Sequence, residues 1–209
     1  MDGLIGRKMG MTQVWDSQGR FTPVTVLEVG PCPVVQVKRQ AREGYEAAQV
    51  GFLPQKPQRL TRALRARFEK AGVPPCRELR EFPLGAGESV KVGDTLTVGL
   101  FEGVALVDVT SVSKGRGFAG PVRRFRMAGG PHGHGGHSKR RIGSVGERNL
   151  PGWIRKGKPM PGHMGAVQVT TRNLAVVQVR KEDNVLLVRG AVPGPAGAVV
   201  IVRKALKKA

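Results

Sequence analysis

Residues 167–203 have the sequence VQVTTRNLAVVQVRKEDNVLLVRGAVPGPAGAVVIVR, in which Val, Leu and Ile dominate. β-Branched and large aliphatic residues at this density favour strands, and the Glu-Asp-Asn at 182–184 has the composition of a hairpin turn. The stretch therefore predicts a run of short strands, two of which form a hairpin. The predicted strands are residues 167–171, 174–180, 185–189 and 198–203.

The first 112 residues have the same character, with short β-branched runs separated by Gly or Pro at most joints. Many short strands at intervals of about 8–12 residues are typical of a closed or sandwiched all-β domain. We therefore predict a mainly β fold in which strands from residues 1–112 and 166–209 complete one barrel. The strands predicted in the first region are residues 22–29, 34–38, 45–52, 89–98 and 104–110.

One short amphipathic helix is predicted at residues 61–71, where Leu64 and Phe68 share a face. Thr61 is a suitable N-cap, and Gly72 begins the stop signal. The arginines of this helix are either RNA contacts or part of a solvated face, and the sequence leaves both readings open. They are Arg62, Arg65 and Arg67.

Residues 113–165, between the two strand-rich regions, differ in composition from both. They hold 12 Lys and Arg, 14 Gly and all four His against one acid, Glu147, and so carry +11 of the formal net charge of +20. Repelling charges with few apolar residues cannot bury enough surface to offset the entropy of ordering the backbone. Loops longer than about 15 residues without structure of their own are generally functional or disordered. We expect an extended basic loop that a polyanionic partner orders.

The overall charge indicates the same class of partner. A net charge of +20 and a pI near 11.3 are typical of nucleic-acid-binding proteins. The alternatives are a soluble basic protein without such a partner and a protein bound to an anionic membrane. The membrane alternative requires a basic amphipathic helix, which a segment rich in Gly and Pro does not supply. An architectural DNA-binding protein is a second hypothesis, and competition between duplex DNA and structured RNA distinguishes it.

Residues 115–122, GRGFAGPV, match the glycine spacing of dinucleotide sites and of the kinase glycine-rich loop. A dinucleotide site requires a helix directly after the glycines, and residues 121–130 have room for only a short one. The H-R-D and D-F-G motifs of a kinase do not follow. We interpret these glycines as backbone that lies close to phosphates while Lys114 and Arg116 neutralise them.

Three histidines, His132, His134 and His137, stand among glycines in the middle of the basic segment. Zinc sites usually take four ligands held on folded elements, and the nearest thiol, Cys76, is far away in sequence. We predict no metal site and no cofactor. The histidines either contact RNA by stacking and hydrogen bonding or are ordinary polar loop residues. A metal-dependent enzyme built on this cluster would purify with stoichiometric metal.

Catalytic groups are scarce in the same segment. Glu147 is its only carboxylate, so neither paired acids nor a nucleophile–base–acid set can be assembled there. We therefore predict that the chain is not an enzyme and takes no small-molecule substrate.

Two short runs set an aromatic ring beside cations, RRFR at 123–126 and WIRKGK at 153–158. Each ring, Phe125 or Trp153, is either a platform for base stacking or a core anchor. Arg suits crowded RNA because its planar guanidinium stacks and donates in a fork. Prolines in the same segment reduce the entropy lost on ordering.

The two cysteines, Cys32 and Cys76, are isolated and make no CxxC pair. They provide no disulfide framework, so a reducing compartment is expected. No apolar run reaches the length of a membrane span, and the first residues lack the hydrophobic block of a signal peptide. We expect a cytoplasmic protein without membrane contact.

Six stretches spread over the whole chain resemble the bacterial members of the large-subunit ribosomal protein L-three (uL-three) family. They are GLIGRKMGMTQ at residues 3–13, PVTV at 23–26, FEKAGV at 68–73, SKGRGFAG at 113–120, GKPMPGHMG at 157–165 and LVRGAVPG at 187–194. Because the resemblance runs from one end of the chain to the other, it is more specific than any single motif.

The resemblance implies a translation-protein-type closed β-barrel with a long extension, and direct binding to large-subunit (23S-type) rRNA early in subunit assembly. The body would lie near the 3′-end domain of that RNA. The tip of the extension, residues 139–153, would approach the peptidyl transferase centre without performing chemistry. Neighbouring large-subunit ribosomal proteins would be the protein partners.

Cations, rings and histidines of the basic segment, with two cations of the first motif, are the residues that we expect to bind rRNA. They are Arg7, Lys8, Lys114, Arg116, Arg123, Arg124, Phe125, Arg126, His132, His134, His137, Lys139, Arg140, Arg141, Arg148, Trp153, Arg155, Lys156, Lys158 and His163.

The chain departs from the family pattern within the loop. Many bacterial members carry a methylated Gln shortly before the Pro-Gly that matches residues 151–152, whereas residues 146–150 are GERNL here. We therefore do not carry that modification over. Pro159 and Pro161 stand where Lys and Ala are commoner, and the histidine cluster is richer than in most members.

Overall fold

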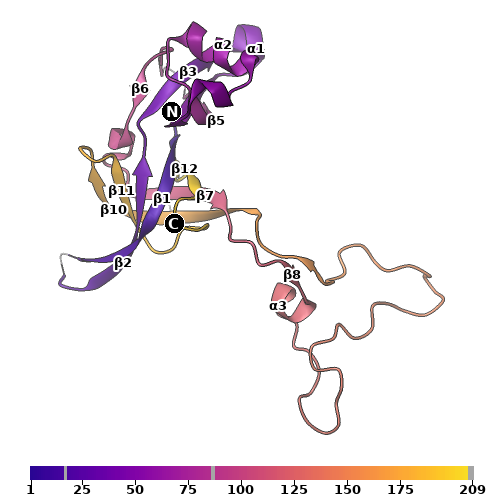
Figure 1. Cartoon of the computed structure of the whole chain (residues 1–209). Coiled ribbons are helices and arrows are strands. Elements are labelled where there is room, and N and C mark those ends of the chain that lie inside the picture. The colour runs from indigo at the N-terminus through magenta and orange to yellow at the C-terminus, as the bar shows by residue number, and fades with distance from the viewer. Residues whose placement is uncertain (17, 86–87, 207–209) are drawn as a thin grey trace. The chain divides into compact units, whose positions relative to one another are not determined.

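The structure, a computed structural model, describes residues 1–16, 18–85 and 88–206. The chain divides into two units, which are drawn together in Figure 1. One unit is Met1–Val112 with Gln168–Ala209, and the other is Ser113–Val167. The basic tail predicted at the end of the chain includes residues 207–209, which lie outside the described residues.

The regular elements are mostly short strands. The strands are β1 (Gly3–Trp15), β2 (Phe21–Val29), β3 (Cys32–Lys38), β4 (Ala47–Pro54), β5 (Cys76–Pro83), β6 (Thr95–Leu96), β7 (Leu106–Val112), β8 (Phe118–Ala119), β9 (Gly162–His163), β10 (Gln168–Arg180), β11 (Val185–Arg189) and β12 (Val199–Lys204). The helices are α1 (Gln40–Glu43), α2 (Arg62–Ala71) and α3 (Pro121–Phe125), with 3-10 turns at Pro57–Arg59 and Val98–Phe101.

Six strands of the first unit close into an antiparallel barrel in the order β1-β12-β7-β10-β11-β2. Three of them precede the basic unit in sequence and three follow it, so the prediction of a mainly β fold with one closed barrel is confirmed. β7 and β10 are neighbours, and Gln168 pairs with Val112. The chain therefore leaves the barrel and returns to it at adjacent strand ends.

The interior of the barrel is filled by aliphatic side chains. Successive side chains of a strand point alternately to the inside and the outside of the barrel. Val107 and Val109 of β7 and Val200 and Val202 of β12 are fully buried, while the residues between them are less so. Each such side chain contributes about 1.5–3 kcal/mol relative to an exposed one. Buried side chains of this kind on β1, β2, β7, β11 and β12, with half-buried Leu174 and Val176 of β10, hold the barrel closed.

A second sheet, in the order β5-β4-β3-β6, shares one continuous hydrophobic core with the barrel. α2 packs on it through Phe68, which is 1% exposed and clusters with Val35 and Cys76. Gly51 of β4 permits this packing, since an added Cβ would lie 2.7 Å from Cys76 Sγ. α2 lies within the residues predicted as helix, although Thr61 makes no side-chain capping bond.

Two strand predictions are wrong. Residues 89–98 contain only the two-residue strand β6, because the chain turns at Gly93 (φ 95°) and Lys91 N donates to Asp94 Oδ2 at 2.8 Å. The two strands predicted at 167–171 and 174–180 are the single strand β10. A register shift inside β10 turns the backbone locally, and the Asn173 N–H bonds to an aspartate on β7.

Burial raises the pKa of the Cys32 thiol from its ordinary value of 9.0 to about 12, and Sγ lies 3.4 Å from Ile5 O. The unfolded chain ionises this thiol near pH 9.0 and the folded chain only near pH 12. Its contribution to the free energy of unfolding is therefore constant below about pH 9 and declines as the pH rises through this window. We expect Cys32→Ala to make that decline shallower, as measured by denaturant titrations at about pH 8 and about pH 11. An identical decline in both proteins would contradict this.

Candidate nucleic-acid interface

The basic unit, Ser113–Val167, begins as a two-stranded stem. β8 and β9 pair antiparallel, with Phe118 opposite His163. The ladder continues where Arg116 N donates to Met164 O at 2.8 Å. These backbone bonds join the outgoing and returning chains and leave the stem's cations exposed.

Gly165 closes the stem at a point where no other residue fits. Its φ is 77°, and an added Cβ would lie 2.2 Å from Lys114 O and 3.0 Å from Arg116 N. Both of those atoms are backbone, so they cannot move aside as a flexible side chain can.

Beyond the stem the chain forms α3, which is a single turn with Pro121 at its start. Arg124 Nη1 donates to Met160 O at 2.8 Å, which ties α3 to the returning chain. The guanidinium carbon of Arg124 lies 4.9 Å from the centroid of the Phe125 ring, and that ring is 44% exposed. A helix of five residues after the glycines differs from the long helix of a dinucleotide site.

The histidine-rich residues form a loop whose ends meet at Gly130 and Lys139. Gly130 N donates to Lys139 O at 3.1 Å, and an added Cβ at Gly129 (φ 78°) would lie 2.5 Å from the same oxygen. All three histidines of the loop are exposed. Within residues 1–16, 18–85 and 88–206, no group of three or more His, Cys, Asp or Glu is placed to hold a metal ion.

Residues 139–158 present exposed cations and apolar side chains together. Arg155 lies 3.5 Å from Glu147, but both side chains are exposed, so this ion pair contributes at most about 1 kcal/mol. Trp153 is 59% exposed and Leu150 84%. Exposed apolar side chains and cations do not stabilise the protein on its own. A partner with bases and phosphates would cover both, because bases stack on rings and phosphates neutralise cations.

The predicted residues from Lys114 to His163 are all exposed except Arg124, which is half-buried. The two predicted residues of the barrel are engaged elsewhere. Arg7 pairs with Glu28 at 2.7 Å. Lys8 is 9% exposed, and its Nζ donates to two backbone carbonyls near the end of the chain, at 2.7 and 3.1 Å. We therefore leave Arg7 and Lys8 out of the proposed RNA-binding set.

Sequence reasoning missed several exposed apolar residues of the basic unit. Phe118 is 80% exposed, and Leu150 and Val145 are also exposed. Their exposure could have been predicted from their position, because apolar residues in a Gly-rich segment without helical or strand periodicity are not placed to pack into a hydrophobic core.

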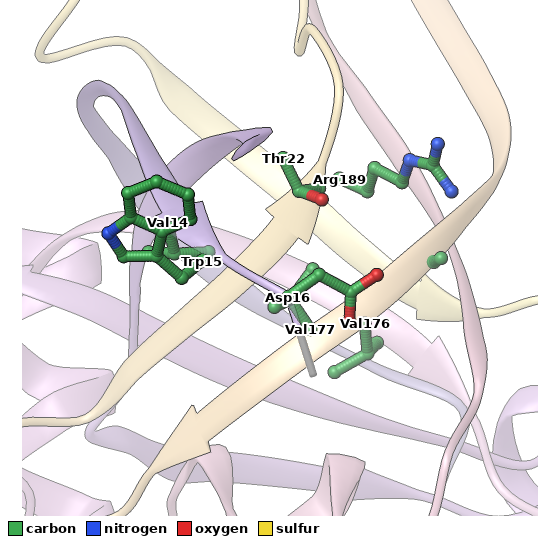
Figure 2. A pocket seen from close by; sticks show the side chains of 8 residues that line it. Val14, Trp15, Asp16, Thr22, Val176, Val177 and Arg189 are labelled. Atoms are coloured by element: carbon green, nitrogen blue, oxygen red, sulfur yellow. The ribbon is translucent and has the colours of Figure 1, made fainter. Parts of the chain in front are cut away.

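The barrel unit has an exposed aromatic pair of its own, at the end of the β1–β2 hairpin. Trp15 and Phe21 are cross-strand neighbours with ring centroids 3.7 Å apart, and they are 66% and 56% exposed. Figure 2 shows the pocket beside this pair, which is lined by Trp15, Asp16 and Arg189 among others. A cross-strand aromatic pair stabilises a hairpin by up to about 1 kcal/mol, so this pair has a structural role without any ligand.

These observations define a class of protein: a closed β-barrel that carries a cation-rich excursion with exposed rings. This combination is typical of proteins that bind a polyanion. In the described part of the chain, no helix is both long and apolar enough to cross a membrane.

Comparison with known proteins identifies the family. The family model of ribosomal protein L3 matches residues 87–185. Large ribosomal subunit protein uL3 of Brachyspira pilosicoli is 43% identical over 208 residues, which cover 100% of this chain and 95% of that protein. The proteins of the same name from Deinococcus radiodurans and Koribacter versatilis are 45% and 48% identical; the matches cover 99% of this chain and 96% and 88% of those proteins.

The chain belongs to the ribosomal protein L3 family, so the resemblance carried by the six stretches is confirmed. This is a family of structural ribosomal proteins and not of enzymes. The family thereby confirms the prediction that the chain is not an enzyme.

Proposed function

We propose that this chain, a structural protein of the cytoplasmic large ribosomal subunit by its family, binds 23S-type rRNA directly through its basic unit. One observation carries the proposal. Nearly every cation of residues 113–165 is exposed beside exposed rings, with Glu147 as the only acid. Such a surface is unfavourable alone and becomes favourable when phosphates neutralise it and bases stack on it.

Structured RNA fits this unit better than duplex DNA does. The DNA major groove admits an α-helix or a two-stranded ribbon that reads base edges, whereas α3 has five residues and the residues beyond it are mostly irregular. Irregular backbone with exposed Phe125 and Trp153 suits unpaired, splayed bases.

The finer parts of the proposal follow from the family resemblance. We propose that the chain joins the particle early in assembly and that residues 139–153 approach the peptidyl transferase centre in a purely structural role. Neighbouring ribosomal proteins are its proposed protein partners. Two contacts support the proposed position of the tip: the close approach of Gly129 to Lys139 O and the bond from Arg124 to Met160 O hold the chain on either side of residues 139–153.

A competition titration tests RNA binding. We expect the full chain to prefer a folded 23S-type rRNA fragment over duplex DNA of equal length and charge by at least about tenfold. The affinity should fall steeply with salt, since each neutralised phosphate releases counterions. Equal affinity for both nucleic acids would favour the architectural DNA-binding hypothesis instead.

A further inference from the structure

A groove on the second sheet of the barrel unit plays no part in the function proposed above. Its volume is about 690 Å³, and its walls come from β3, α1 and α2 with Val92 beyond the strand. Three features of this groove, its strand edge, its floor and its rim, fit the same kind of occupant.

The first feature is an open strand edge. β3 pairs with β4 along one side. On the other side, within the described residues, its ladder ends at Val34, which exchanges backbone bonds of 2.8 and 2.9 Å with Asp94 and Gly93. The turn at Gly93 then takes the chain away from the sheet, where the sequence had predicted a longer strand. Residues 35–38 therefore present an edge that can pair with another strand.

The second feature is an apolar floor. Val37 of β3 and Ala63 and Ala66 of α2 line the groove, and Val92 is 47% exposed at its far side. An extended segment paired to the edge would place alternate side chains on this floor, which is how strand addition obtains specificity.

The third feature is a cationic rim. Four cations line the groove: Arg39, Arg42, Arg67 and Lys70. Among the described residues that line the groove, Glu43 is the one acid, and its carboxylate already accepts from Arg39 N at 3.2 Å and lies 3.9 Å from Arg42. Acidic side chains of an occupant would complement this rim.

We propose that this groove binds an extended, acidic segment of a neighbouring large-subunit protein, which adds as a strand to the open edge of β3. RNA fits less well, because its phosphates cannot donate hydrogen bonds to the backbone carbonyls of a strand edge and gain nothing from contact with an apolar floor. The proposal rests on the assignment to the large subunit but not on RNA binding by residues 113–167.

The test places the photoreactive residue p-benzoylphenylalanine at Ala66, in full-length chain assembled into large subunits. After irradiation we expect an adduct that survives ribonuclease, is destroyed by protease and maps to a peptide with more Asp and Glu than Lys and Arg. A ribonuclease-sensitive adduct would overturn the proposal. So would the lack of any adduct at both Ala66 and Ala63 in subunits shown by sedimentation to contain the chain.

The same probe at Phe125 reports separately on RNA binding by the basic unit, so a failure of one proposal can be distinguished from a failure of the other.

A matched pair of variants tests the cationic rim. Lys70→Glu and Arg62→Glu change the same charge on exposed residues of α2, but only Lys70 lines the groove. We expect Lys70→Glu to lower the yield at Ala66 by about threefold or more and Arg62→Glu to leave it unchanged. Equal yields from the two variants would refute the role of the rim.

Discussion

Replacing residues 123–160 by a short Gly-rich linker is expected to lower the affinity for rRNA by about a thousandfold or more and to leave the barrel folded. The replacement removes ten of the 12 cations of residues 113–165. A protein with about 6–10 phosphate contacts loses about 10³–10⁵ in affinity between about 50 and 200 mM salt, so such contacts carry a comparable share of the affinity, and the salt slope falls by about 0.9 for each phosphate that is no longer neutralised. A short linker suffices because Ala119 pairs with Gly162 across the stem. Filter binding to an rRNA fragment at several salt concentrations measures both quantities.

A matched pair of triple variants separates a specific surface from general charge. Lys139, Arg140 and Arg141 changed together to Gln should weaken binding and lower the salt slope by about 2.7, if each cation neutralises one phosphate. Three exposed cations of the barrel unit changed in the same way should alter neither quantity. These control residues are Arg20, Lys56 and Arg59. Equal losses from both triple variants, or an unchanged salt slope after removal of residues 123–160, would contradict the proposal.

The barrel could be predicted because several of its strands are short runs of Val, Leu and Ile, as β11 and β12 show. β1 was missed because glycines interrupt the pattern and are unfavourable in strands. Two of those glycines, Gly3 and Gly6, are explained by the tertiary structure. An added Cβ would lie 2.4 Å from Val202 O at Gly3 and 2.5 Å from Glu28 O at Gly6, so both positions serve the close approach of neighbouring strands.

The second sheet was harder to predict from the sequence, for a different reason. β5 has the sequence CRELREFP, in which pairs of charged residues separate single apolar ones, so it shows neither the alternation of a half-buried strand nor a β-branched run. The 89–98 segment has the opposite property: its composition favours a strand, yet the turn at Gly93 ends the pairing early. Local propensity could not show that this turn would leave one edge of β3 open.

Composition located the basic unit but could not assign its individual residues. The exposure of the cations beyond Lys114 could be predicted from the charge and glycine content alone, because such a segment cannot form a hydrophobic core that would bury them. Lys8 lies in an equally basic motif, yet its Nζ reaches Val192 O, 184 residues away in sequence. Only the closed barrel brings these two groups together, so no local pattern could distinguish a structural lysine from an RNA-binding one.

The largest effect expected from a single substitution in the basic unit is that of Gly165→Ala. The new side chain must accept φ near 77°, which costs about 1–2 kcal/mol. Its Cβ would also overlap Lys114 O at 2.2 Å, and overpacking of this kind costs about 1–3 kcal/mol more. We expect the stem to open, so that the Arg116 amide, which bonds to Met164 O, exchanges with solvent at least about tenfold faster.

Opening the stem should also weaken RNA binding by about tenfold or more, because cations that are no longer held in place lose more entropy on binding. Gly117→Ala is the matched control: Gly117 lies in the same stem with φ 66°, but an added Cβ meets nothing within 4 Å. It imposes the same backbone strain without the overlap, so its effect on amide exchange and on affinity should be clearly smaller. If the two variants behave alike, the overlap with Lys114 O is not what makes glycine necessary at residue 165. If Gly165→Ala opens the stem but leaves affinity unchanged, the basic unit binds RNA as a flexible chain, and the stem does not pre-organise it.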